Sequence, residues 1–162
     1  MPTLRDDIAA DVAAAYDGAF GGWRLAVRAA SNPSVHAVAL LRLTLTAPAT
    51  TRPLWRNLLI AKHSIDVGDG ASIGPGLYLP HPLGIVIGRY ARVGARARLY
   101  QHVTLGSKTH HDEEYPTLED DVVVYPGTVI AGPVRIGAGA VIGANSFVAR
   151  DVDAGAVVHG TW

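Results

Sequence analysis

The chain has 162 residues, contains no cysteine, and balances 14 lysines and arginines against 14 aspartates and glutamates. This length suffices for one domain with a hydrophobic core and is short for two. The even charge balance argues against partners held by electrostatics, such as nucleic acid or an anionic membrane surface. The lack of cysteine excludes a disulfide framework, a thiolate metal site and a cysteine nucleophile.

No segment has the pattern of a targeting or membrane-spanning sequence. The first ten residues carry Arg5, Asp6 and Asp7, and no apolar stretch typical of a signal peptide follows them. The apolar stretch 35–45 is interrupted by His36 and Arg42 and is too short to cross a bilayer. We therefore expect a soluble, cytoplasmic protein.

The first 62 residues predict an α-helical region. Acidic residues at positions 6 and 7 favour a helix start, and Gly21-Gly22 should end or bend that first helix. A second helix should begin at residues 31–33, where Pro occupies the first turn, and end before Pro48. Pro53 should open a third, short helix.

From residue 65 onward a branched aliphatic side chain recurs at every sixth position. The members of three such rows are Ile73 and Leu79; Ile87, Val93, Leu99 and Leu105; and Leu118, Val124, Ile130, Ile136, Ile142 and Val148. Neither a helix, with its period of 3.6, nor a strand, with its period of 2, predicts this spacing. A six-residue repeat is typical of a parallel β-helix, in which about three hexads make one coil and the aliphatic residues fill the interior. The ends of such a stack need covering, and the helical region plausibly covers one of them.

The repeat is interrupted twice. Two extra residues stand between Leu79 and Ile87, which places Pro80-His81-Pro82 at a bend, and the polar segment 107–116 separates the two long rows. We interpret that segment as a loop that protrudes from the stack. The expected organisation is a helical region at 1–62 followed by a β-helix domain at 63–162.

His81 is the leading candidate for catalysis. A neutral imidazole near pH 7 is a natural general base for a hydroxyl group. Asp66 precedes it by fifteen residues, a spacing that can bring the two onto adjacent coils, where the carboxylate would fix the tautomer of the ring. Pattern alone leaves open that His81 only packs in a turn and that Asp66 is an ordinary turn aspartate.

Several joined motifs resemble serine O-acetyltransferases of the hexapeptide-repeat acyltransferase superfamily. The matching segments are Ile65-Asp66, Ile73-Gly-Pro-Gly-Leu-Tyr-Leu79, His81, Gly84-Ile-Val-Ile-Gly88 and Tyr100-Gln-His-Val-Thr-Leu-Gly106. The resemblance implies a left-handed parallel β-helix and a homotrimer, and it leaves open whether two trimers pair. It also implies that acetyl-CoA, as co-substrate, binds between neighbouring subunits. His81 would then deprotonate the acceptor hydroxyl for direct attack on the thioester, with Asp66 as its partner.

The same resemblance assigns residues to the cofactor groove. Gly106, Pro126 and Ala144 match positions that line the CoA groove in the family. Ser107 and Lys108 stand where the family has a glycine-rich loop, and Lys108 would offer a point charge to a CoA phosphate. A solvated loop lysine is the alternative.

The acceptor positions depart from the family pattern. Pro80 replaces an aspartate before the catalytic histidine, and Glu114 and Tyr115 replace an arginine–histidine pair before a proline. Asp17 matches a further acceptor-binding aspartate only with an alignment gap. Without the arginine fork, bidentate recognition of a carboxylate is lost. We therefore expect an O-acetyltransferase for serine or, given these changes, for another small hydroxyl compound or a sugar.

Other functions remain open on the same scaffold. These are N-acylation, transfer from a longer acyl-CoA, and a non-catalytic trimeric binding protein. A metal-dependent hydratase would need His81, His102 and one histidine of the cluster 110–113, but that cluster has no established ligand spacing and we expect no metal.

The end of the chain carries one further expectation. The sequence stops at Trp162, short of the longer family tail that can dock onto the cysteine-forming partner enzyme. We therefore expect no cysteine synthase complex.

Overall fold

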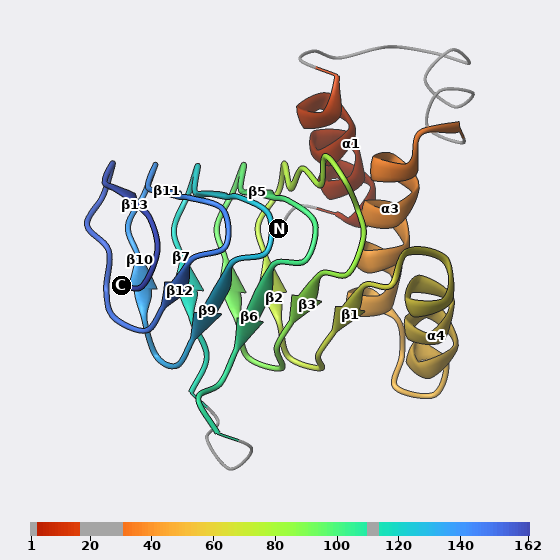
Figure 1. Cartoon of the computed structure of the whole chain (residues 1–162). Coiled ribbons are helices and arrows are strands. Elements are labelled where there is room, and N and C mark those ends of the chain that lie inside the picture. Colours follow the sequence, from red (N-terminus) through yellow and green to blue (C-terminus); the bar gives the residue numbers. More distant parts are fainter. Residues whose placement is uncertain (1–2, 17–30, 110–113) are drawn as a thin grey trace.

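A computed structural model describes residues 3–16, 31–109 and 114–162 (Figure 1). Its helices are α1 (Leu4–Ala15), α3 (Pro33–Thr46) and α4 (Arg52–His63). The strands are β1 (Asp66–Val67), β2 (Ser72–Ile73), β3 (Val86–Ile87), β4 (Arg92–Val93), β5 (Arg98–Leu99), β6 (Thr104–Gly106), β7 (Thr117–Leu118), β8 (Val123–Val124), β9 (Val129–Ala131), β10 (Arg135–Ile136), β11 (Val141–Ile142), β12 (Phe147–Val148) and β13 (Val157–Val158).

Local capping explains where the helices begin and end. Thr3 and Asp6 form a reciprocal capping box at the start of α1. Asn32 caps α3 by accepting a hydrogen bond from the Ser34 amide at 2.9 Å, with Pro33 at the first helical position. The predicted start of the second helix at 31–33 is therefore confirmed, whereas the predicted break at Gly21-Gly22 lies outside the described residues.

The strands stack into three parallel sheets that form the sides of a prism (Figure 1). We call the sheet of β1, β3, β6, β9 and β12 sheet A, the sheet of β2, β4, β7 and β10 sheet B, and the sheet of β5, β8, β11 and β13 sheet C. The chain passes from A to B to C and back to A once per coil, and all pairings are parallel. This is the parallel β-helix that the hexad period predicts.

The aliphatic rows point into the prism. Every member of the two long rows is buried, and Leu118, Ile130 and Ile142 are at most 1% exposed. Among the shorter run, Leu79 is fully buried and Ile73 is half-buried. One inward residue per side on each coil therefore supplies a continuous apolar core, which extends into α3 and α4 through residues such as Leu41 and Leu59.

The helices lie at the end of the stack where the first coils begin (Figure 1). A buried ion pair holds α1 and α3 there. The guanidinium of Arg42 donates to both carboxylate oxygens of Asp11 at 2.9 and 3.0 Å, and to the carbonyls of Ile73 and Gly74 at 2.6 Å. Asp11 also accepts a hydrogen bond from the Leu77 amide at 2.8 Å. One Arg–Asp pair thus joins two helices to the first coil.

Candidate active site

The predicted site residues lie along two different edges of the prism. We call the turns from sheet C to sheet A the C–A edge and those from sheet A to sheet B the A–B edge. The C–A edge carries Pro80, His81, Pro126 and Ala144. The A–B edge carries, at or after the end of β6, Gly106, Ser107, Lys108, Glu114 and Tyr115. Within one chain, His81 therefore lies on a different edge from the predicted binding residues of the loop after β6.

His81 is exposed and lines a pocket of about 530 Å³. The other described lining residues are Tyr16, Ser31, Asn32, Pro33, Ser34, Tyr78, Pro80 and Pro82. The α3 N-terminus and the end of α1 thus form one wall, and the C–A turn of the first coil forms the other. We call this the acceptor pocket. Its described lining includes one ionisable base and no carboxylate or guanidinium.

Two tyrosine rings continue from His81 along the C–A edge. The Tyr100 ring lies 6.3 Å from the His81 ring, and Tyr125 stacks on Tyr100 with centroids 5.0 Å apart and planes tilted by 12°. They occupy equivalent positions on successive coils, because each follows the last residue of a sheet C strand. The sequence analysis did not identify this aromatic surface, which lies between the candidate base and Pro126.

Asp66 is bound by an arginine of α4. The Nε and Nη2 atoms of Arg56 donate to its two carboxylate oxygens at 2.7 and 2.9 Å. The hydrogen bond that Arg56 donates to Asp66 raises the pKa of Arg56 above its ordinary value. No hydrogen bond joins Asp66 to His81 among the described residues. Sequence reasoning missed Arg56, since nothing in the local pattern links a helix position to a carboxylate ten residues later.

The A–B edge presents a different surface. The Lys108 side chain lies over Gly132, where an added Cβ would meet it, and the Ser107 hydroxyl donates to the Thr109 carbonyl at 2.8 Å. Glu114 is exposed. Tyr115 packs its edge against Tyr90, with ring centroids 6.0 Å apart. Lys108 therefore lies two residues after Gly106, and its side chain is exposed at the start of the loop.

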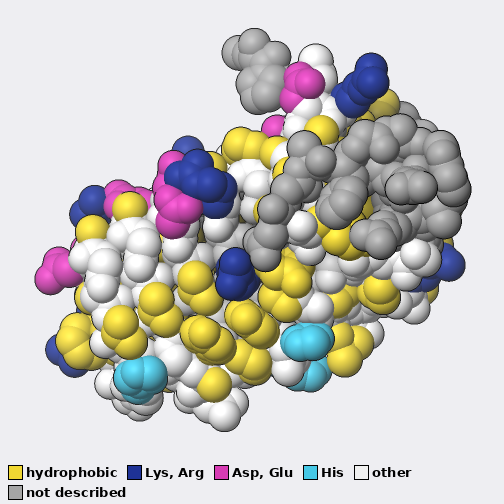
Figure 2. All heavy atoms as spheres, turned by 90° about the horizontal axis from the view of Figure 1, so that it is seen from above, with side chains coloured by type: hydrophobic (Ala, Val, Ile, Leu, Met, Phe, Trp, Pro, Cys, Tyr) yellow, Lys and Arg dark blue, Asp and Glu magenta, His cyan; other side chains and the backbone are white. Residues whose placement is uncertain are grey.

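The outward faces of the three sheets differ in polarity. Sheet B presents Ser72, Arg92, Thr117 and Arg135. Sheet C presents Arg98 followed by Val123, Val141 and Val157, and sheet A presents Asp66, Val86, Thr104, Val129 and Phe147. Figure 2 shows hydrophobic side chains gathered over the side of the molecule seen from above. Exposed apolar faces of this kind mark surfaces that contact another molecule.

Some predicted residues lie outside the described part of the chain, namely Asp17 and the cluster 110–113. Among residues 3–16, 31–109 and 114–162, no group of three or more histidines, cysteines or carboxylates is placed to hold a metal ion. Within those same ranges no helix is long and apolar enough to cross a membrane.

The sequence and the fold have well-characterised relatives. Residues 115–150 match the family model for the bacterial transferase hexapeptide (six repeats). The chain is 32% identical over 172 residues to a plasmid serine acetyltransferase of Synechococcus elongatus, an alignment that covers 98% of this chain and 54% of that relative. The chain is thus serine acetyltransferase-like and carries the hexapeptide repeat of bacterial transferases. It spans about half the length of the curated relatives it matches, such as 54% of this one.

Solved serine acetyltransferases share the fold. The Entamoeba histolytica isoform 3, in complex with cysteine, superposes with a TM-score of 0.82 at 30% identity, covering 96% of this chain and 57% of that chain. A serine acetyltransferase in complex with CoA gives a TM-score of 0.83 at 25% identity, covering 98% and 68%. The left-handed parallel β-helix with an N-terminal helical region is therefore confirmed.

Proposed function

We propose that this serine acetyltransferase-like protein is an acetyl-CoA-dependent O-acetyltransferase with His81 as its general base. The observation that carries the proposal is the exposed imidazole at the wall of the acceptor pocket, on the edge that also bears Pro126 and Ala144. A serine acetyltransferase of the same fold has been solved with CoA. The cysteine-free sequence fits a cytoplasmic enzyme.

The reaction needs one proton relay and one acyl transfer. The neutral His81 ring removes the proton of the acceptor hydroxyl as its oxygen attacks the carbonyl carbon of the thioester. The tetrahedral intermediate then collapses, the carbon–sulfur bond breaks, and the imidazolium returns its proton to the departing CoA thiolate. The acceptor leaves as an acetyl ester, and the base is regenerated without a metal ion.

A homotrimer would unite the two edges of the site. The residues assigned to CoA are divided between the C–A edge, with Pro126 and Ala144, and the A–B edge, with Gly106, Ser107 and Lys108. A groove between subunits, formed by the C–A edge of one chain and the A–B edge of the next, would contain both sets. The apolar faces of sheets A and C support such an assembly, and light scattering should give three times the 17.0 kDa chain mass, or six times if trimers pair.

Asp66 has capacity left for His81. A carboxylate has about four lone-pair sites, and Arg56 uses one on each oxygen. We propose that Asp66 is a positioning residue that accepts a hydrogen bond from the His81 ring while Arg56 holds it. Asp66→Asn should then lower kcat and move the acidic limb of the pH–rate profile to lower pH, because a carboxylate stabilises the imidazolium. Arg56→Met should lower kcat less, and equal effects of the two variants on kcat and on the profile would show a purely structural ion pair.

The decisive experiment measures thiol release from acetyl-CoA with a panel of hydroxyl acceptors. His81→Ala should lower kcat by roughly 10²–10⁴-fold, the usual contribution of a general base, and added imidazole should restore part of the rate. Mass spectrometry of the product distinguishes O-acetylation from N-acylation. An acceptor turned over equally fast by the wild type and by His81→Ala would refute the assignment. Absence of CoA binding in calorimetry would favour a non-catalytic binding protein.

A further inference from the structure

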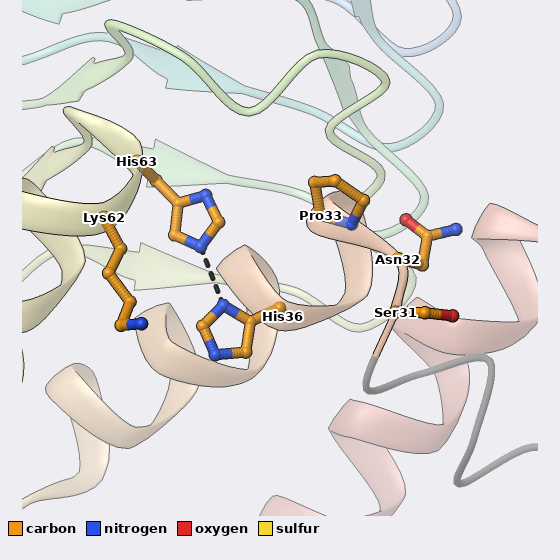
Figure 3. Close-up of a pocket in the computed structure, with 6 residues that line it drawn as sticks. All are labelled: Ser31, Asn32, Pro33, His36, Lys62 and His63. Carbon is orange, nitrogen blue, oxygen red and sulfur yellow. Dashed lines mark hydrogen bonds between the residues drawn. The ribbon is translucent and has the colours of Figure 1, made fainter.

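A second pocket adjoins the acceptor pocket (Figure 3). It has a volume of about 370 Å³ and is lined by Ser31, Asn32, Pro33, His36, Lys62 and His63. Its first three lining residues also line the acceptor pocket. The two pockets therefore meet at the start of α3. We call the second one the basic pocket.

Three basic side chains gather in the basic pocket. The His36 ring of α3 and the His63 ring at the end of α4 are hydrogen-bonded, with His36 Nδ1 and His63 Nε2 2.8 Å apart (Figure 3). Lys62 is exposed beside them. Desolvation, followed by the nearby charges of His36 and Lys62, lowers the pKa of His63. The described residues that line this pocket thus include three basic side chains and no acidic one.

The acceptor pocket has the opposite character. Its described walls are tyrosines, prolines, serines and an asparagine, and Asn32 donates a hydrogen bond to the Tyr16 hydroxyl at 2.9 Å. Neutral hydrogen-bonding groups and aromatic rings suit an uncharged, hydroxyl-bearing part of a ligand. The carboxylate of free serine is only two carbons from its hydroxyl. With that hydroxyl at His81, the carboxylate would remain in the neutral pocket, away from the lysine and the histidine pair.

We propose that the acceptor is a hydroxyl compound that carries a phosphate or carboxylate group remote from the acetylated hydroxyl, and that the basic pocket binds this anionic group. The proposal rests on the acetyl transfer proposed above, since it places the reacting hydroxyl at His81.

The chemistry of the three side chains suits an anion. Lys62 presents an ammonium with three donors. Within the hydrogen-bonded histidine pair one ring donates to the other, so at most one of the two rings is protonated while that bond lasts. An anion in the pocket offsets the repulsion among the three groups and favours uptake of a second proton by the pair. Binding should therefore strengthen as the pH falls, with His36, His63 and Lys62 as the charged groups that face one another here.

The first test measures binding alone, without acetyl-CoA. The imidazole resonances of the full chain are followed by NMR during titration with inorganic phosphate, glucose, glucose 6-phosphate and glucuronate. Phosphate should perturb His36 and His63 and raise their apparent pKa values. The sugars that carry phosphate or carboxylate should perturb the same pair and also His81, and whichever binds more tightly identifies the anionic group. If neither phosphate nor glucuronate perturbs His36 and His63 more than glucose does, the basic pocket is not an anion site.

Matched variants test whether phosphate binding depends on Lys62 in particular or on positive surface charge in general. Lys62→Ala should weaken phosphate binding about tenfold or more, equivalent to roughly 1.4 kcal/mol, while Lys62→Arg should retain most of it. Arg92→Ala removes an equally exposed cation from sheet B and should leave binding unchanged. Equal losses in Lys62→Ala and Arg92→Ala would mean general attraction to surface charge and would overturn the proposal.

A kinetic test separates this inference from the proposed function. For an anionic acceptor, Lys62→Ala should raise KM and largely retain kcat, because the lost contact binds ground state and transition state alike. If no acceptor releases thiol from acetyl-CoA, the proposed transfer fails, and the NMR titration still decides whether an anion binds. If free serine is acetylated faster than every anionic hydroxyl compound, the transfer stands and the remote-anion inference falls.

Discussion

Breaking the buried ion pair of Arg42 and Asp11 should destabilise the fold far more than breaking a surface pair of the same geometry. The chain offers a matched comparison, because Arg96 binds both carboxylate oxygens of Asp121 at 2.7 Å. The side chains of the first pair are 4% and 3% exposed, and those of the second are 58% and 53% exposed. The two pairs therefore differ in burial and in the additional backbone hydrogen bonds of Arg42 and Asp11.

The magnitude follows from what each substitution leaves behind. Arg42→Leu leaves the Asp11 charge buried, with the backbone amides of Gly76 and Leu77 as its remaining donors, and removes the donors to the Ile73 and Gly74 carbonyls. Such a loss costs about 3–5 kcal/mol in free energy of unfolding, or roughly 6–20 °C in midpoint for a domain of this size. Arg96→Leu should change stability little, because water and salt screen an exposed pair.

Urea unfolding of the single and double variants measures these effects. Replacing both Arg42 and Asp11 by leucine should recover part of the loss, because no buried charge then remains unpaired. Burial already raises the pKa of Asp11 above its usual range, against the influence of Arg42. In Arg42→Leu that pKa rises further, so the variant should regain stability as the pH falls and Asp11 becomes protonated. Equal losses for Arg42→Leu and Arg96→Leu would refute the reasoning.

Three further outcomes can be measured by thermal or chemical unfolding. Ile142→Ala should cost about 2–5 kcal/mol because its side chain is fully buried, and an unchanged midpoint would contradict the core register. The lowered pKa of His63 means that the unfolded chain binds more protons, so wild-type stability should fall as the pH drops below about 6.5, and His63→Gln should flatten that slope. Gly137→Ala should cost about 3 kcal/mol, because an added Cβ would meet the backbone of Ala154. Gly139→Ala should cost only about 1 kcal/mol, since its neighbourhood is open and only its positive φ of 68° opposes a side chain; the reverse order would be inconsistent with the coil stacking.

The β-helix could be predicted from sequence because each coil repeats the same six-residue pattern. An aliphatic residue every six positions specifies which side chain points inward, and Leu118, Ile130 and Ile142 do so. The start of α3 was equally readable, because Asn32 and Pro33 act within one turn of the chain. Short-range chemistry of this kind does not depend on how distant elements dock.

The contacts that shape the site depend on docking and could not be predicted. Arg42 finds Asp11 across 31 residues, and His36 meets His63 across 27. Asp66 was assigned to His81 by its spacing together with the family resemblance, yet the docking of α4 on the first coil brings Arg56 onto the same carboxylate. The hexad pattern specifies which face of the coil Asp66 occupies. It does not specify whether Arg56 or His81 donates a hydrogen bond to its carboxylate.

The β-helix and the helical region therefore have separate roles in the proposed enzyme. The β-helix positions the candidate base His81 and the two edges assigned to CoA, all of which lie at turns between strands. The acceptor pocket and the basic pocket share residues 31–33, which belong to the start of α3. Substitutions in the helical region can thus alter the acceptor without disturbing a single hexad. In the proposed enzyme the repeat thus carries His81 and Asp66, while the start of α3 contributes walls to both pockets.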